Sequence, residues 1–372
     1  MGHAICFRRT LPERLIDFPK IALMTLVAGL SIGGMPAFLG DLLLSWGVPS
    51  SITLPTQPIE SVHPGQEGLY ARGLCQKLVV VRPYLMIAWA GSLSVVREMI
   101  DQMDEALPFS HDELKRRPDA LFAPLTKAGE TDAVEMVALF NDGDTVYPYC
   151  IKTRGLDIDG TRIYLLGSGQ SAFWKFVQEV PHSIPPTENA EGFSARTVMM
   201  RFVGNALMAQ YSTKYGLDHS WGGGFEVAYP TPTGFRKIDN ILVRAWRLDF
   251  NGELRSAEIS FLLHYEGAAL HVTHFGEHEG TTVVPAMVNR ITPKRSKDIV
   301  VPEWTIDLFE SLKHGRNFCA IEHDRPGSKS HAQFEFSNSV LVGWNMDRSR
   351  VERIIQSFDA RMDDPFSIGA LS

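Results

Sequence analysis

A long uncharged stretch near the N-terminus limits the possible folds of this chain to two main alternatives. Residues 21–40 carry no charged side chain, and they follow a basic segment that contains Arg8, Arg9, Arg14 and Lys20. A basic flank before about 20 uncharged residues is typical of a membrane anchor or a signal segment. However, Gly33-Gly34 separates two apolar runs within the stretch, a pattern that favours a buried β-hairpin. We expect the hairpin, with a membrane segment as the alternative.

The composition is that of a globular protein, with 44% hydrophobic and 21% charged residues. The net charge of −7 provides no electrostatic reason to expect a nucleic-acid partner. The four cysteines are widely spaced and form no Cys-x-x-Cys pair. This spacing favours a reducing compartment and argues against a disulfide framework or a zinc ribbon.

Over residues 25–229, the apolar patterns predict blocks of strands that alternate with pairs of helices. Strands are expected within 25–45, where there are two, and at 76–81, 84–90, 133–140, 146–152, 162–166 and 225–229. Helices are expected at 92–107, 112–126, 170–180 and 194–215. This order indicates an α+β fold, a four-layer αββα sandwich in which two sheets pack face to face with a helix layer outside each.

From about residue 230 the pattern becomes β-rich. Antiparallel strands are expected at 241–250, 258–265 and 269–275, followed by a helix at 304–313, another strand pair and a C-terminal helix at 348–361. We therefore divide the chain into three parts. Residues 1–24 are a leader or a mis-assigned start, residues 25–229 are a first domain, and residues 230–372 are a β-rich extension whose role the sequence does not indicate.

Four residues lie at the ends of expected strands. Asp41 follows Thr25 by sixteen residues, at the end of the second expected strand. Lys77 opens a later strand, and Gly91 ends the strand after it, fourteen residues further on. Taken alone, each residue has an ordinary structural explanation: strand propensity, a strand-end cap, a solvated charge or a strand terminus.

Further along the chain, Gly167-Ser168-Gly169 precedes an expected helix, and Asp218 is followed by Gly222-Gly223. In their order and spacing, all these motifs together resemble those of the proteasome β-subunit family and its bacterial relatives, the peptidase subunits of ATP-dependent ring proteases. The resemblance covers residues 25–229. It implies the αββα sandwich of N-terminal-nucleophile hydrolases, hydrolysis of a peptide or small amide, ring-like homo-oligomers and a cytoplasmic location. It implies no cofactor, metal, nucleic acid or membrane.

The resemblance also implies roles for individual residues. Thr25 would supply a hydroxyl nucleophile together with its own α-amine as the base, and such an amine titrates near pH 7.7–8.0. Lys77, held by Asp41, would keep the amine neutral by like-charge repulsion. The Gly91 N–H would donate to the developing oxyanion.

Ser168 and Asp218 would orient the amine. The chain also departs from the family pattern: Leu42 and Leu43 replace the Ser or Arg expected after the aspartate, and Trp221 stands where a serine is expected. These departures affect the surroundings of the amine.

The register of the first hairpin tests this hypothesis. A two-residue turn at Gly33-Gly34 places Thr25 opposite Leu42, and the side chain of Asp41 then points to the other face. A three-residue loop that also includes Ile32 places Thr25 opposite Asp41 on the same face, because a slip of one residue reverses every side chain. We therefore predict the three-residue loop, with a glycine in the left-handed region.

The chemistry also requires Thr25 to be the first residue. With residues 1–23 attached, its nitrogen is an amide without basicity. Translation from Met24 followed by removal of that methionine would expose the amine, as would cleavage of a leader. Two other functions stay open: a catalytically inactive scaffold or binding protein of the same fold, and a membrane-anchored or exported β-rich protein.

Four closely spaced histidines form a candidate metal site. His264, His271, His274 and His278 lie within fifteen residues. His271 and His274 are three apart, so they point to opposite faces of a strand, which is unfavourable for a shared metal. We therefore expect no metal there.

Overall fold

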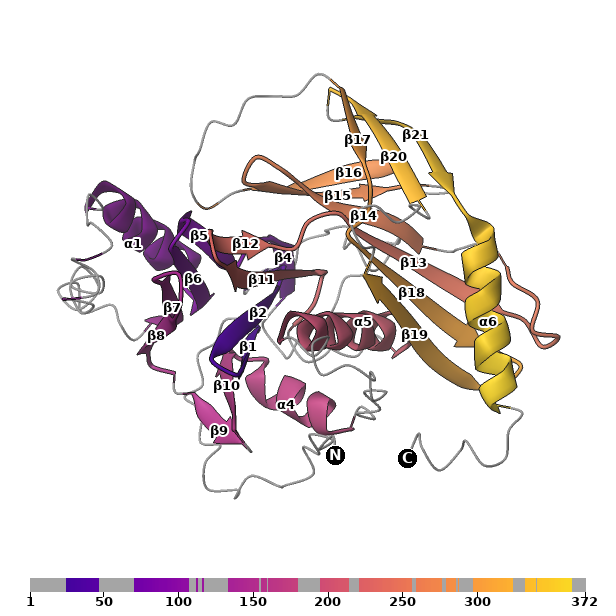
Figure 1. Cartoon of the computed structure of the whole chain (residues 1–372), viewed down its shortest axis with the longest axis horizontal. Helices are drawn as coiled ribbons and strands as arrows, with labels where there is room; N and C mark the ends of the chain where they lie inside the picture. The colour runs from indigo at the N-terminus through magenta and orange to yellow at the C-terminus, as the bar shows by residue number, and fades with distance from the viewer. Residues whose placement is uncertain are drawn as a thin grey trace.

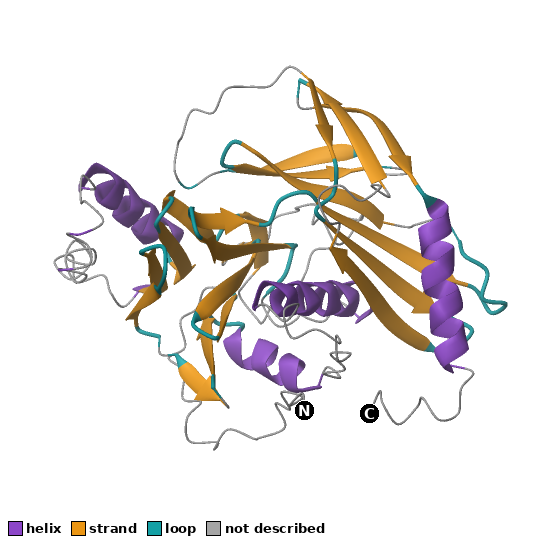
Figure 2. Ribbon diagram, in the orientation of Figure 1, coloured by secondary structure: helices purple, strands orange, loops and turns teal. Residues whose placement is uncertain are grey.

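The computed structural model describes residues 25–46, 70–106, 112, 116, 133–153, 155–158, 160–179, 195–213, 221–255, 259–275, 279–285, 287, 297–323, 332–338 and 340–362. Of these residues, 53% are in strands and 24% in helices. The strands of the described part form five sheets (Figures 1 and 2).

The first sheet has the strand order β12-β11-β2-β1-β10-β9. Its strands are β1 (Val27–Ile32), β2 (Met35–Asp41), β9 (Leu156–Ile158), β10 (Thr161–Leu166), β11 (Phe225–Thr231) and β12 (Gly234–Lys237). The uncharged stretch at residues 21–40 thus supplies the central hairpin of this sheet from residue 27 onward. Among the described residues, no helix is both long and apolar enough to cross a membrane.

The turn of this hairpin differs from our prediction. Ile32 pairs with Met35, so the connection is a two-residue turn and the predicted three-residue loop is wrong. Gly33 and Gly34 have φ angles of 58° and 82°, the two positive values that a type I′ turn requires. This turn matches the twist of the flanking strands, which explains why the Gly-Gly pair forms the whole turn.

The second sheet consists of β5 (Leu78–Arg82), β6 (Leu85–Gly91), β7 (Val134–Asn141) and β8 (Val146–Ile151). One of its faces packs against the first sheet, where Val27 and Phe38 share a core with Leu78 and Met86. The helix α1 (Leu93–Ala106) covers the other face. A short two-stranded sheet, β3 (Leu43–Trp46) with β4 (Tyr70–Leu74), adjoins the end of β2.

The other face of the first sheet carries α4 (Gln170–Glu179) and α5 (Ala195–Thr213). A third sheet, with the order β16-β15-β14-β13-β18-β19, lies on the far side of α5 (Figure 1). Its strands are β13 (Ile241–Leu248), β14 (Ile259–Glu266), β15 (Ala269–His274), β16 (Gly280–Val284), β18 (Trp304–Ser311) and β19 (Arg316–His323). Helix α5 therefore lies between two sheets.

The outer face of the third sheet is covered by two elements. A three-stranded sheet of β17 (Lys297–Val300), β20 (Ala332–Ser337) and β21 (Val340–Met346) shares a core with Leu242 and Leu262. Helix α6 (Arg348–Met362) packs against Trp246 and Phe309. The residues after 230 thus build two of the five sheets.

The expected four-layer αββα sandwich with a C-terminal extension is therefore wrong. Strands dominate, and the layer that holds α5 is an interior layer that the third sheet covers. The physical reason lies in α5 itself, which has buried residues all round its surface, among them Met199, Met200, Val203 and Leu207. Such a helix must be covered on more than one side. At Gly204 an added Cβ would lie 2.6 Å from Ile321 of β19, so this glycine permits the close approach.

The helix expected at 304–313 is also wrong, because these residues form β18. This strand pairs in parallel with β13 and antiparallel with β19, and its first six residues are all buried. A short apolar run that is buried on both faces has no period that separates strand from helix. Of the helix expected at 112–126, only residues 112 and 116 are described.

Candidate active site

Thr25 lies at the entrance to β1 and is 1% exposed. Since β10 pairs with β1 and Leu166 faces Val27, the loop that follows β10 passes over the start of β1. The Thr25 N–H points to Ser168 Oγ at 3.4 Å, and the Gly169 N–H donates to the Thr25 carbonyl oxygen at 3.2 Å. The Gly167-Ser168-Gly169 loop thus holds Thr25 through its main chain.

Gly167 leaves no room for a side chain next to Thr25. Its φ angle is +90°, and an added Cβ would lie 2.1 Å from the Thr25 carbonyl oxygen and 2.6 Å from Thr25 Oγ1. Only glycine fits this position, because any side chain would displace Thr25. Within the described part of the chain, Thr25 Oγ1 is buried and has no hydrogen-bond partner.

Asp41 and Lys77 form an ion pair, with Lys77 Nζ 2.5 Å from Asp41 Oδ1, and both side chains are 0% exposed. Asp41 Oδ1 also accepts from the Leu26 N–H at 2.9 Å, and Oδ2 accepts from the Gly222 N–H at 3.0 Å. The Lys77 ammonium donates further to the Leu43 carbonyl at 2.5 Å. Asp41 is thereby bound to the residue that directly follows Thr25.

The hydrogen bond from the Leu26 N–H to the Asp41 carboxylate explains how Asp41 is attached next to Thr25 even though the turn has two residues. Leu26 lies opposite Asp41 in the observed register, and the Asp41 N–H donates to the Leu26 carbonyl. The carboxylate bends back to the Leu26 N–H, so the connection runs through the main chain. It does not depend on two side chains that share one face of the sheet, which was the assumption behind the three-residue loop.

Complete burial raises the pKa of the Asp41 carboxyl above its ordinary value, and the Lys77 ammonium and two backbone N–H groups oppose that rise. All three partners of the carboxyl are hydrogen-bond donors, the arrangement that an ionised carboxylate requires. Lys77 and Asp41 therefore depend on each other inside the core.

Gly91 ends β6 in the second sheet, and β6 contacts β1. Its φ angle is +115°, and an added Cβ would lie 2.2 Å from the Ala133 carbonyl oxygen. A glycine is therefore required for the close approach of β7 as well as for the backbone angle.

Glu135 is a residue of this site that the sequence reasoning missed. It lies on β7, next to the residue that faces Gly91, and its Oε2 accepts from the Gly167 N–H at 2.6 Å. Burial raises the pKa of the Glu135 carboxyl, and the Gly167 N–H and the charge of Lys152 oppose this rise. A lone carboxylate in an otherwise apolar strand was the signal that could have identified it.

Asp218 lies outside the described residues. Trp221, at the position where the family has a serine, is 0% exposed and packs edge-on against Phe173 with ring centroids 5.5 Å apart. Apolar core thus occupies this position. Gly222, which follows, provides the N–H that holds Asp41.

The histidines of the cluster lie on both faces of the third sheet, because His271 and His274 are three residues apart on β15. His264 and His271 face each other across β14 and β15, with ring centroids 5.2 Å apart, whereas His278 lies outside the described residues. Burial, together with His271, lowers the pKa of His264 to about 4. Among the described residues, no group of three or more His, Cys, Asp or Glu side chains could hold a metal ion.

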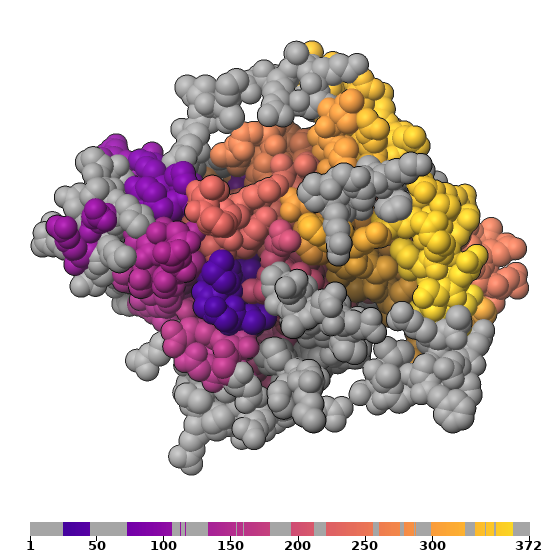
Figure 3. All heavy atoms as spheres, in the orientation of Figure 1, coloured from indigo at the N-terminus to yellow at the C-terminus, as the bar shows by residue number. Residues whose placement is uncertain are grey.

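A cavity of about 250 Å³ lies elsewhere, near the Gly33-Gly34 turn, and is lined by Pro36, Tyr164 and Arg162 among others. Its charged groups, Arg162 and Asp157, are paired with each other at 2.8 Å and are well exposed. Gly33 and Gly34 are exposed, and part of the segment 25–46, drawn in indigo, lies at the surface (Figure 3). This cavity therefore adds no group to the Thr25 site.

No model of a known protein family matches the chain, and no curated protein matches it either. The function is therefore argued from the geometry of the site.

Proposed function

We propose that this chain is a threonine-nucleophile amide-bond hydrolase that becomes active when Thr25 is its first residue. The observation that carries the proposal is the buried Lys77–Asp41 ion pair, attached by a hydrogen bond to the Leu26 N–H directly after Thr25. A buried ammonium is costly for a protein to maintain. Asp41 links this ammonium to the residue that follows a threonine whose hydroxyl makes no hydrogen bond within the described part of the chain, which favours a functional role for the pair.

In the first step, the Thr25 α-amine accepts the proton of Oγ1, directly or through one water, and Oγ1 attacks the carbonyl carbon of the substrate amide. The Lys77 ammonium favours the neutral, basic form of the amine by like-charge repulsion. The Gly91 N–H donates to the oxyanion of the tetrahedral intermediate. Ser168, 3.4 Å from the Thr25 nitrogen, orients the amine.

In the second step, the protonated amine returns its proton to the leaving nitrogen, the C–N bond breaks, and an ester to Oγ1 remains. Water, deprotonated by the same amine, then attacks the ester carbon; the bond from this carbon to Oγ1 breaks, the amine returns the proton to Oγ1, and the carboxylic acid leaves. The residues of the chain supply every proton transfer, so the cycle needs no cofactor.

The resemblance to proteasome-like subunits supports a peptide as the substrate, with a small-molecule amide as the alternative. It also supports a homo-oligomer, ring-like in the family, and a cytoplasmic location. These parts of the proposal rest on the motifs from Thr25 to Gly222 and on the cysteine spacing.

The test compares two chains, one with all 372 residues and one started at Met24 so that removal of the methionine exposes Thr25. Intact mass establishes each N-terminus, and fluorogenic peptide amides report hydrolysis. We expect activity only with an exposed Thr25, and a β-lactone should acylate that chain once, at Thr25. Thr25→Ala should abolish both signals, and full hydrolysis by this variant would end the proposal.

A non-catalytic scaffold is the second candidate. It is favoured by the apolar burial of Trp221 at the position where the family has a serine. If a protein with an exposed Thr25 neither hydrolyses amides nor reacts with the β-lactone, the scaffold is the better description.

A further inference from the structure

The segment that carries Lys77 is held by side chains from distant parts of the chain. Residues 75–77 lie outside any strand, because β5 begins at Leu78. The N–H groups of Lys77 and Leu78 donate to Glu226 Oε1, at 2.5 and 2.8 Å. A single carboxylate oxygen on β11 therefore receives the two N–H groups at the start of β5, where regular ladder pairing has not yet begun.

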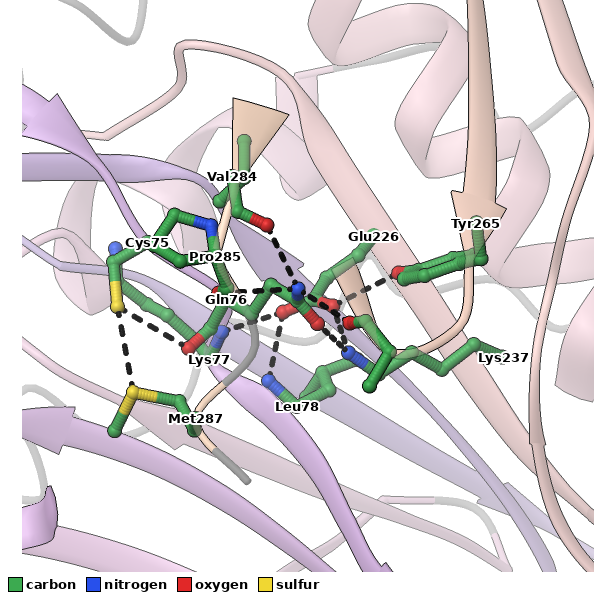
Figure 4. Close-up of polar contacts among 11 residues, drawn as sticks. Cys75, Gln76, Lys77, Leu78, Glu226, Lys237, Tyr265, Val284, Pro285 and Met287 are labelled. Atoms are coloured by element: carbon green, nitrogen blue, oxygen red, sulfur yellow. Dashed lines mark hydrogen bonds and ion pairs between the residues drawn. The ribbon is translucent and has the colours of Figure 1, made fainter. Parts of the chain in front are cut away.

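The other oxygen of Glu226 reaches the third sheet. Glu226 Oε2 accepts from Lys237 Nζ at 2.6 Å and from the Tyr265 hydroxyl at 3.1 Å (Figure 4). Tyr265 lies on β14, and Lys237 lies on β12, at the edge of the first sheet. Glu226 itself is 2% exposed. Its carboxylate therefore accepts hydrogen bonds from residues of three different sheets, Leu78, Lys237 and Tyr265.

Gln76 adds a second connection. Its Oε1 accepts from Lys237 Nζ at 2.5 Å, and its Nε2 lies 2.9, 3.1 and 3.2 Å from the carbonyl oxygens of Ala268, Val284 and Pro285 (Figure 4). All three carbonyls belong to the C-terminal part of the chain. The residue directly before Lys77 is thus docked onto the β14–β15 turn and the end of β16.

We propose that Glu226 and Tyr265 are positioning residues for Lys77, so that the third sheet helps to position a residue of the Thr25 site. This inference rests on the proposed function, because it concerns the placement of the ammonium beside the amine. Lys77 Nζ meets Asp41 at 2.5 Å, and a displacement of its backbone moves that contact. A misplacement of about 1 Å in a catalytic group costs on the order of 100-fold in rate.

The Tyr265 hydroxyl is a dependable donor in this network. Burial, and then the neighbouring charge of Glu226, raise the pKa of Tyr265 well above its ordinary value. The phenol therefore stays protonated over the pH range in which an α-amine titrates. Tyr265→Phe removes this one donor and preserves the ring on which Lys237 Nζ rests, 5.1 Å from the ring centroid.

The test uses Tyr265→Phe and Glu226→Asp in the protein with an exposed Thr25. Tyr229→Phe is the matched control, because Tyr229 also lies on β11 and its hydroxyl accepts from Arg196, outside the network. We expect kcat to fall about 10-fold or more in both test variants with little change in KM, and to be unchanged in the control.

The pH profile separates positioning from general stability. The amine is active when neutral, so activity rises as pH rises through the pKa of the amine. If Lys77 moves away, its repulsion weakens and the pKa of the amine rises. The acid limb of kcat/KM should therefore shift to higher pH in the two test variants. Wild-type kcat together with a wild-type acid limb in Tyr265→Phe and Glu226→Asp would overturn the inference.

Hydrogen exchange of the peptide that contains Lys77 and Leu78 provides a readout that does not require activity. Both test variants should exchange faster there than wild type, and Tyr229→Phe should not. Unchanged exchange overturns the inference whatever the activity. The two variants can also exchange faster than a wild-type protein that shows no Thr25-dependent hydrolysis. That result supports the positioning of Lys77 and refutes only the proposed function.

Discussion

Replacing Lys77 by methionine removes one half of the buried ion pair and preserves most of the volume of the side chain. Lys77 and Asp41 are both 0% exposed, so neither charge is screened by water. Removing one partner of a buried pair costs about 3–5 kcal/mol, because the other charge is left uncompensated. Asp41 keeps its two backbone N–H donors, which places the expected loss at about 3 kcal/mol at pH 7.

The loss should depend on pH in a defined direction. Burial raises the pKa of Asp41 and the Lys77 ammonium opposes that rise, so Lys77→Met raises the pKa of Asp41 in the folded state further. Asp41 has the same unfolded pKa in both proteins, so the loss relative to wild type grows as pH rises from the folded pKa of Asp41 in wild type to its higher folded pKa in the variant. The slope reaches about 1.4 kcal/mol per pH unit. The variant should therefore be closest to wild type in acid.

Guanidinium denaturation at pH 5 and pH 7 measures this difference. Arg162→Met is the control, because Arg162 pairs with Asp157 at 2.8 Å with exposures of 48% and 62%, and an exposed pair contributes about 1 kcal/mol or less. The reasoning fails if Lys77→Met costs no more than Arg162→Met, or if its cost is the same at both pH values.

Two further changes test the surroundings of Thr25. Gly167→Ala should lower kcat by about 100-fold, because the added methyl lies 2.1 Å from the Thr25 carbonyl oxygen. Gly143→Ala is the control and should leave kcat unchanged, since Gly143 has a similar φ of +101° and an added Cβ would have no atom within 4 Å. Equal kcat values in the two variants would contradict the clash at Gly167. Glu135→Gln should gain stability relative to wild type as pH rises above about 4.3, because burial raises the pKa of Glu135 and glutamine imitates the protonated form. Denaturation midpoints at pH 4 and pH 7 check this, and a difference that is constant or falls with pH would refute it.

Local patterns predicted much of the strand and helix content. The apolar runs on either side of Arg82-Pro83 form β5 and β6, and the helix expected at 92–107 forms α1, Leu93–Ala106. These predictions succeeded because hairpin strands and helix ends depend on neighbouring residues. The sequence spacing also drew attention to Asp41 and Lys77, which the structure joins.

Predictions that depended on distant partners failed. The 304–313 segment forms β18 because β13 and β19 flank it. The periodicity of its own residues does not show which strands will lie beside it. Helix α5 is an interior element because the third sheet covers it. Glu135 and Glu226 were overlooked, since their partners are 32 and 149 residues away along the chain.

Local sequence patterns indicated where most strands lie and which residue types are available for threonine chemistry. The packing of the third sheet on α5, and its connection to the Lys77 segment through Tyr265 and Glu226, became visible only in the folded protein. Turns and the strands of hairpins follow from short-range geometry. The position of a buried charge follows instead from the donors that surround it in space, and in this protein those donors come from opposite ends of the chain.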